Sequence, residues 1–139
     1  MALNSISVLL IEDNLGEGKL VSETIHEENW MEVRVEQAFR LSTGIERLKT
    51  GKYDVILLDL NLPDSYGLST LTKLLNEEQN TPIVILTGLE DEDLGMEAVK
   101  LGAQDYLVKY QIDGRSLIRS ICYAIERKRA SGRWEKINL

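Results

Sequence analysis

The chain switches repeatedly between short apolar runs and longer amphipathic stretches. Four apolar runs stand out, over residues 6–11, 55–58, 83–86 and 105–108. Because helix-like stretches separate them, these runs indicate strands of a parallel sheet that is buried on both faces. Residues 31–36 instead alternate apolar and charged side chains, which predicts another strand with one wetter face, most simply at an edge of the sheet.

Apolar residues recur at helical spacing in the stretches that follow the strands. The first predicted helix covers residues 15–29 and the fourth covers residues 90–101, while Gly51 should stop the second. The expected inward-facing residues are Leu20, Val21, Thr24 and Ile25 in the first helix, Leu41, Ile45 and Leu48 in the second, Leu68, Leu71, Leu74 and Leu75 in the third, Leu94, Val99 and Leu101 in the fourth, and Leu117, Ile118, Ile121, Cys122 and Ile125 in the fifth.

A strand–helix unit repeated five times predicts an α/β fold. Right-handed crossovers place the helices on both faces of a doubly wound, five-stranded parallel sheet. With the alternating second strand at an edge, the favoured strand order is 2-1-3-4-5, with a switch point between strands 1 and 3. Ligands of such sheets bind beyond the carboxyl ends of the strands.

Each of the four apolar strands is followed by polar residues. Glu12 and Asp13 follow the first strand, Asp59 the third, Thr87 the fourth and Lys109 the fifth. Because parallel strands present their carboxyl ends at one edge of the sheet, three carboxylates, a hydroxyl and an ammonium should meet there. Such a set can bind a divalent cation and a phosphoryl group together.

The donor atoms of this set are oxygens, and no His or Cys stands at ligand spacing. Three neighbouring carboxylates repel one another, and a hard divalent cation relieves that repulsion, so Mg2+ is expected, or Mn2+ in its place. An aspartate can act as a nucleophile and form an aspartyl phosphate. Asp59 is the best candidate, with charge neutralisation from Lys109 and a hydrogen bond from the Thr87 hydroxyl.

Composition narrows the functional classes. A chain of 139 residues suggests one domain, and its net charge of -7 argues against a nucleic-acid-binding surface as the primary function. The single cysteine, Cys122, excludes an internal disulfide and favours a reducing compartment. No segment has the pattern of a signal peptide or the length of a transmembrane helix, so a cytoplasmic protein without membrane contact is expected.

Taken together, these motifs resemble the receiver domain of two-component response regulators. The resemblance is carried by Glu12-Asp13, by the stretch from Asp59 to Gly67, by Thr87-Gly88 and by the stretch from Asp105 to Lys109. Each motif alone is weak, but four of them in order at strand ends are highly specific. The resemblance covers about residues 5–128, and it implies a flavodoxin-like fold and a signalling switch that catalyses only its own phosphotransfer and dephosphorylation.

The resemblance also implies roles for single residues. Asp59 would take a phosphoryl group from the phosphohistidine of a histidine kinase or phosphotransfer protein, in a Mg2+-dependent reaction with Thr87 and Lys109. Asp13 would bind Mg2+ directly and Glu12 through water. Asp59 and the backbone carbonyl of Asn61 would supply further ligands.

Thr87 and Tyr106 would form a switch pair that reports phosphorylation to an output domain or protein partner on the face of helix 4, strand 5 and helix 5. The sequence departs from the usual receiver pattern at two positions. Glu12 stands where many receivers have aspartate, and Tyr110 follows Lys109 where the family usually has proline. A non-proline cis peptide costs about 3–4 kcal/mol, so the sequence leaves open whether the Lys109–Tyr110 peptide is cis.

Other interpretations of the same residues compete with this one. Asp59 could be a turn residue, and Asp13 or Thr87 could only cap a helix. A phosphohydrolase with an aspartyl intermediate would need Asp-x-Asp after the first strand, where Glu12-Asp13-Asn14 stands. A flavodoxin-like cofactor protein would need a phosphate-cradling loop there, and this loop is acidic. A receiver-like domain used only for docking would not need the intact set of site residues.

The C-terminal residues are interpreted separately. Residues 1–128 are expected to form the receiver domain, and residues 129–139 a C-terminal tail or helical connector. Good helix formers continue past Ile125, and Gly132 is the first plausible stop. A connector would lead to a further domain or bind a partner through Trp134.

Overall fold

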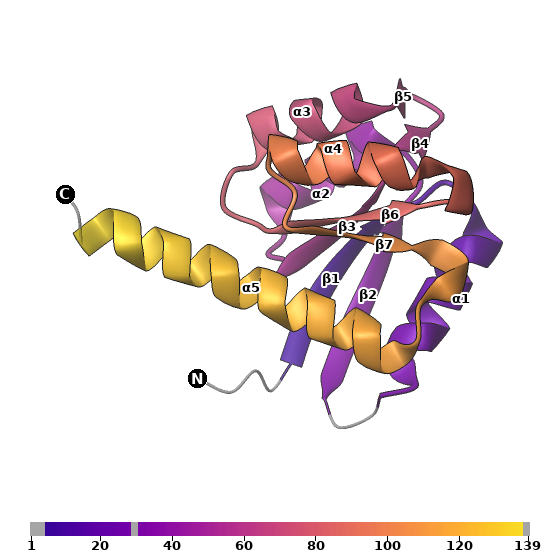
Figure 1. Ribbon diagram of the computed structural model, residues 1–139, viewed down its shortest axis with the longest axis horizontal. Coiled ribbons are helices and arrows are strands. Elements are labelled where there is room, and N and C mark those ends of the chain that lie inside the picture. The colour runs from indigo at the N-terminus through magenta and orange to yellow at the C-terminus, as the bar shows by residue number, and fades with distance from the viewer. Residues whose placement is uncertain (1–4, 29–30, 138–139) are drawn as a thin grey trace.

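The computed structural model describes residues 5–28 and 31–137. Within these ranges the main sheet consists of β1 (Ser5–Ile11), β2 (Glu32–Ala38), β3 (Val55–Asp59), β6 (Ile83–Thr87) and β7 (Asp105–Val108). The short strands β4 (Asn61–Leu62) and β5 (Ser65–Tyr66) form a separate antiparallel hairpin. The order of the main sheet is β2-β1-β3-β6-β7, with all neighbours parallel, which confirms the predicted 2-1-3-4-5 order (Figure 1).

Helices cover both faces of this sheet. The α-helices of the described ranges are α1 (Leu15–His26), α2 (Leu41–Thr50), α3 (Leu68–Glu77), α4 (Glu92–Leu101) and α5 (Gly114–Ile137). Short 3-10 helices, η1 (Leu89–Asp91) and η2 (Lys109–Gln111), precede α4 and α5. α1 and α5 lie on one face and α2, α3 and α4 on the other, so the α/β fold is doubly wound (Figure 1).

The central strands send alternate side chains into two cores. Leu10 of β1 belongs to the core that contains Ile25 of α1 and Ile121 of α5. Ile11, the next residue, belongs to the core that contains Leu71 of α3. Burial on both faces explains why β1, β3 and β6 are apolar almost throughout, whereas β2 at the edge alternates between buried and exposed residues.

In two helices, some of the residues that face the core differ from the prediction. α1 ends at His26, and Leu20 lies on its exposed side. On α4, the predicted core residues Val99 and Leu101 are 38% and 47% exposed. The buried positions of α4 are instead small, and Gly95 is one of them. Small residues let this helix approach β7 closely. Leu94 packs partly buried against the core as predicted, whereas Val99 and Leu101 face outward.

α5 continues past Gly132, which was the first stop that the sequence indicated, and its backbone stays helical to Ile137. A glycine inside a helix costs about 1 kcal/mol, which the helix formers around it can outweigh. The last turns of α5 extend beyond the edge of the sheet (Figure 1). The side chain of Trp134, for which a partner contact was expected, lies outside the described residues.

Two further findings concern the described ranges as a whole. They contain no helix that is long and apolar enough to cross a membrane. They also contain no cis peptide bond, so the Lys109–Tyr110 peptide, which the sequence left open, is trans.

Candidate functional site

The acidic residues predicted at the switch point lie together. β1 and β3 are neighbours in the sheet, and Ile11 pairs with Leu58 at their carboxyl ends. Glu12 and Asp13 come directly after Ile11, and Asp59 comes directly after Leu58. Each of the three offers one carboxylate oxygen within 4.8 Å of the others. Glu12 is fully buried, Asp59 is 7% exposed and Asp13 is exposed. The group therefore has a buried side and an open side, as a site for a partly hydrated cation requires.

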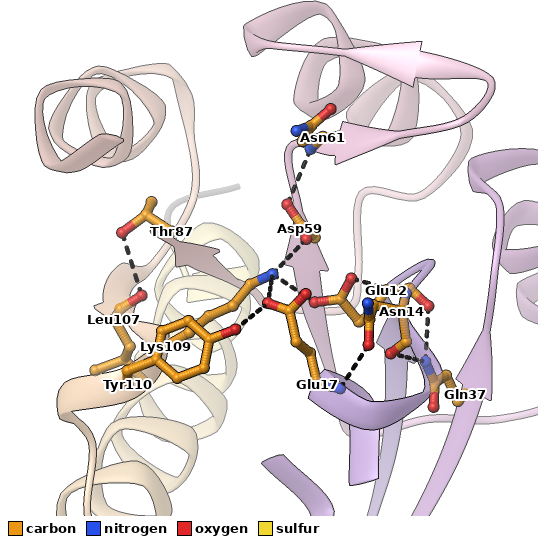
Figure 2. A network of polar contacts seen from close by, with 10 residues as sticks. All are labelled: Glu12, Asn14, Glu17, Gln37, Asp59, Asn61, Thr87, Leu107, Lys109 and Tyr110. Carbon is orange, nitrogen blue, oxygen red and sulfur yellow. Dashed lines mark hydrogen bonds and ion pairs between the residues drawn. The ribbon is translucent and has the colours of Figure 1, made fainter. Parts of the chain in front are cut away.

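Lys109 reaches this group from the end of β7. Its Nζ lies 2.6 Å from Oδ2 of Asp59 and 2.5 Å from Oε1 of Glu12 (Figure 2). The Lys109 side chain is only 10% exposed. A buried ammonium between two carboxylates offsets part of their repulsion, and it places a positive charge directly beside Asp59.

Burial and charge act on the pKa values of this pair in opposite ways. Burial raises the pKa of Glu12 to about 7, although the hydrogen bond from Lys109 lowers it. Burial alone would lower the pKa of Lys109, but hydrogen bonds to Asp59 and Glu12 outweigh it and raise that pKa above its ordinary value. Lys109 is therefore cationic at neutral pH, while Glu12 holds its proton more tightly than a free glutamate does.

Thr87 ends β6, and its hydroxyl donates a hydrogen bond of 3.4 Å to the carbonyl oxygen of Leu107 on β7. Thr87, Asp59 and Asn61 line a common cavity of about 30 Å³, which is enough room for a water molecule. A small group attached to Asp59 could therefore come within reach of the Thr87 hydroxyl.

Tyr106 lies on β7, the strand next to β6, which ends at Thr87. It is half-buried, and its ring packs against Gly95 of α4, where an added Cβ would lie 2.7 Å from the ring. The position of the Tyr106 side chain thus depends on the position of α4.

Asn61 lies at the start of β4, and its backbone N–H donates a 2.9 Å hydrogen bond to Oδ1 of Asp59.

Several residues that the sequence did not single out hold the loop between β1 and α1. Asn14, rather than Asp13, caps α1, because its Oδ1 accepts a 2.9 Å hydrogen bond from the Glu17 N–H. Gln37, on the neighbouring edge strand, donates from Nε2 to the carbonyl oxygens of Glu12 at 2.8 Å and Asn14 at 3.2 Å (Figure 2). The backbone around Glu12 and Asp13 is therefore held by hydrogen bonds before and after Asp13.

Asp64 holds the loop after β3 in a similar way. Its two carboxylate oxygens accept 2.9 Å hydrogen bonds from the N–H groups of Leu41 and Ser42, in the first turn of α2. The residue in the N-cap position of α2, Arg40, makes no side-chain cap. These bonds from Leu41 and Ser42 hold the pKa of Asp64 below its usual value, against the effect of burial.

Two more residues, to which the sequence analysis gave no role in the site, lie beside Lys109. Oε1 of Glu17 lies 3.1 Å from the Lys109 ammonium and accepts a 2.7 Å hydrogen bond from the Tyr110 hydroxyl (Figure 2). Only the position of Tyr110 next to Lys109 in the sequence hinted at this contact. Lys109 therefore has three carboxylate partners.

Comparison with known proteins agrees with this fold. The model of the response regulator receiver domain family matches residues 8–121, and the chain belongs to this family. Among curated relatives, the transcriptional regulatory protein CiaR of Streptococcus pneumoniae is 36% identical over 104 residues, which cover 75% of this chain and 45% of the relative. The cell cycle transcriptional regulator CtrA of Caulobacter vibrioides is 36% identical over 105 residues, 73% of this chain and 43% of the relative.

The chain spans less than half the length of these relatives. Two solved structures of receiver domains, by contrast, are matched over almost their whole length. The receiver domain of the Francisella response regulator 1452 is 27% identical with a TM-score of 0.73, over 88% of this chain and 98% of that one. The receiver domain of a putative LuxO repressor protein from Vibrio parahaemolyticus is 25% identical with a TM-score of 0.77, over 94% and 98%. The chain is thus a receiver domain, a module of two-component signalling.

Proposed function

We propose that Asp59 is the phosphoacceptor, taking a phosphoryl group from the phosphohistidine of a histidine kinase or phosphotransfer protein. The observation that carries this proposal is the position of the Asp59 carboxylate. It belongs, with Glu12 and Asp13, to the three carboxylates that could hold a cation, and the Lys109 ammonium lies 2.6 Å from it. In the transfer, an Asp59 oxygen forms a bond to phosphorus while the bond from phosphorus to the histidine nitrogen breaks. The released imidazole keeps the electron pair and takes a proton.

The metal site of the proposal consists of Glu12, Asp13, Asp59 and the backbone carbonyl of Asn61. The fit rests on the chemistry of the donors, since the carboxylates are hard oxygen ligands. One buried ammonium balances only part of their charge. Mg2+, or Mn2+ in its place, supplies charge neutralisation for the transferred group when bound. Asp13, which is exposed, is the member best placed to meet a partly hydrated ion.

Lys109 and Thr87 act on the phosphoryl group in this proposal. A phosphoryl group adds about -1.5 to -2 charges, which attract the Lys109 ammonium and the Thr87 hydroxyl. Because the hydrogen bond from Thr87 to Leu107 is long, at 3.4 Å, little opposes a turn of that hydroxyl toward Asp59. The displaced hydroxyl changes the space beside β7, and Tyr106 responds to it.

The partner surface in this proposal is the face formed by α4, β7 and α5. It borders Tyr106, and α4 exposes the apolar side chains of Met96, Val99 and Leu101 on its outer side. An output domain or separate protein would bind there, as the names of the longer relatives, which are transcriptional regulators, suggest. The helical residues 129–137 would serve as a connector.

The test uses a small phosphodonor such as acetyl phosphate, with intact-protein mass spectrometry as the readout. The protein should gain one labile phosphoryl group in Mg2+ and none in excess chelator. Asp59→Asn, which keeps the shape but loses the nucleophile, should gain none. Asp91→Asn is the control, because Asp91 lines the same cavity and should not be needed. Continuous release of phosphate from many organic phosphates without an adduct would favour a phosphohydrolase instead.

A further inference from the structure

The three carboxylate partners of Lys109 are not equivalent. An ammonium has three donor hydrogens, and Glu12, Asp59 and Glu17 lie at 2.5, 2.6 and 3.1 Å from it. Glu12 and Asp59 also belong to the carboxylate group that could hold a cation. Glu17 does not belong to that group. If a cation occupies the group, it competes with Lys109 for two of its three partners and repels it, and only Glu17 remains.

Glu17 is well placed to keep its hold on Lys109. Its backbone is fixed in the first turn of α1 by the cap from Asn14. Its carboxylate is oriented by the Tyr110 hydroxyl at 2.7 Å, and Tyr110 follows Lys109 directly in the chain. The bond from Tyr110 and the contact with Lys109 lower the pKa of Glu17, so this group is a carboxylate at neutral pH.

From this geometry, and resting on the proposed function, we propose that Glu17, held by Tyr110, is a positioning residue for Lys109. When the cation binds, Glu17 retains the ammonium beside Asp59 with one of its hydrogen bonds. The other two donors stay available for oxygens of the incoming phosphoryl group. Neither Glu17 nor Tyr110 touches the reacting atoms, so both act only through the place that they give to Lys109.

The first test measures how well Lys109 is protected, without any phosphoryl chemistry. An amine-reactive ester labels the unprotonated amine of accessible lysines, so a lysine held in ion pairs reacts slowly, and peptide mass spectrometry reads the label on Lys109. Without Mg2+, Glu17→Ala should be labelled at nearly the wild-type rate, because Glu12 and Asp59 still hold the ammonium. With saturating Mg2+, Glu17→Ala should be labelled severalfold faster than the wild type. Equal labelling of the two proteins in Mg2+ would overturn the proposal.

Two variants separate positioning from a merely structural role. Glu17→Gln keeps an oxygen that can accept from Tyr110 or Lys109, so it should restore part of the protection. Tyr110→Phe keeps the ring and loses only the hydroxyl, so it should loosen Lys109 in Mg2+ less than Glu17→Ala does. Glu23→Ala, at an exposed position of the same helix, is the matched control and should behave like the wild type. Full protection of Lys109 in both Tyr110→Phe and Glu17→Ala would contradict the role of the pair.

The second test compares rates of phosphorylation by acetyl phosphate in Mg2+. Glu17→Ala should be phosphorylated severalfold more slowly than the wild type at every Mg2+ concentration, with the Mg2+ midpoint unchanged, because the metal ligands are intact. Wild-type protein that gains no phosphoryl group would count against the proposed function. A phosphorylated wild type with an equally fast Glu17→Ala would count against the role of Glu17 alone.

Discussion

The ring of Tyr106 lies on Gly95, where an added Cβ would be 2.7 Å from the Cγ and Cδ2 atoms of the ring. Contacts that short do not occur, so Gly95→Ala must displace the ring or α4. Overpacking typically costs 1–3 kcal/mol, and alanine regains about 1 kcal/mol of helix propensity. We expect a net loss of about 1 kcal/mol in the free energy of unfolding, measured by urea denaturation. Met96→Ala, at an exposed position of the same helix, should change it by less than about 0.5 kcal/mol.

Gly95→Ala also tests the switch. If phosphorylation moves Tyr106 away from α4, the substitution favours the moved position in advance. The NMR signals of the Tyr106 ring should then differ from those of the wild type before any phosphoryl mimic is added, and they should change less when it is added. A variant that shows the full wild-type response would separate Tyr106 from the switch.

Asp64 should matter for α2 although it lies in another segment. Asp64→Ala removes both hydrogen bonds to the first turn of α2 and should lower the free energy of unfolding by about 1 kcal/mol. Because the folded-state pKa of Asp64 is lowered, this contribution is complete above its ordinary value of 3.8 and is lost as the pH falls further. Asp91→Ala is the control, since Asp91 precedes α4 without a side-chain cap. An equal loss for both variants would refute the capping role.

Gln37 should affect metal binding without touching the metal. Gln37→Ala frees the carbonyl oxygens of Glu12 and Asn14 and loosens the loop that presents Asp13. We expect Mg2+ to bind up to about tenfold more weakly, the lower end of what supporting residues of metal ligands contribute. Isothermal titration calorimetry measures this directly. Arg34→Ala, on the exposed side of the same edge strand, should bind Mg2+ as the wild type does.

Glu12 should make metal binding depend on pH. Its pKa in the folded, metal-free protein is raised from 4.5 to about 7, so the folded state holds this proton more tightly than the unfolded chain does. The resulting stability is complete below pH 4.5 and is lost as the pH rises to about 7. Mg2+ requires the carboxylate, so its apparent affinity should rise over the same interval, by at most about tenfold per pH unit. Glu12→Gln should flatten this dependence, and an equally steep profile in that variant would assign it to another group.

The sheet could be predicted from the sequence because its signal is local. The buried strands β1, β3 and β6 are apolar almost throughout, and β2 shows its edge position by alternation. The run at residues 105–108 was predicted to be buried as well, but β7 lies at the other edge of the sheet and is only half-buried. The phase of α4 could not be predicted in this way, because its inner face is built from small residues. Gly95 can face the core because a residue without a side chain leaves room for the Tyr106 ring. Tyr106 belongs to β7, so the sequence of α4 alone does not reveal this requirement.

The site shows the same division. Asp59 and Lys109 could be predicted because each follows an apolar strand, and the topology then brings the strand ends together. Gln37 and Glu17 could not, because their partners lie 25 and 92 residues away and no repeating pattern marks the contact. Residues that support a site from a neighbouring element become visible only when the loops are in place.

The central claim is that Asp59 itself carries the phosphoryl group. Borohydride reduces an aspartyl phosphate to homoserine, and this change can be located by sequencing peptides in a mass spectrometer. After treatment with acetyl phosphate and Mg2+ followed by borohydride, we predict homoserine at position 59 and an unchanged aspartate at position 13. Homoserine at Asp13, or phosphorylated protein in which Asp59 is unmodified, would contradict the account.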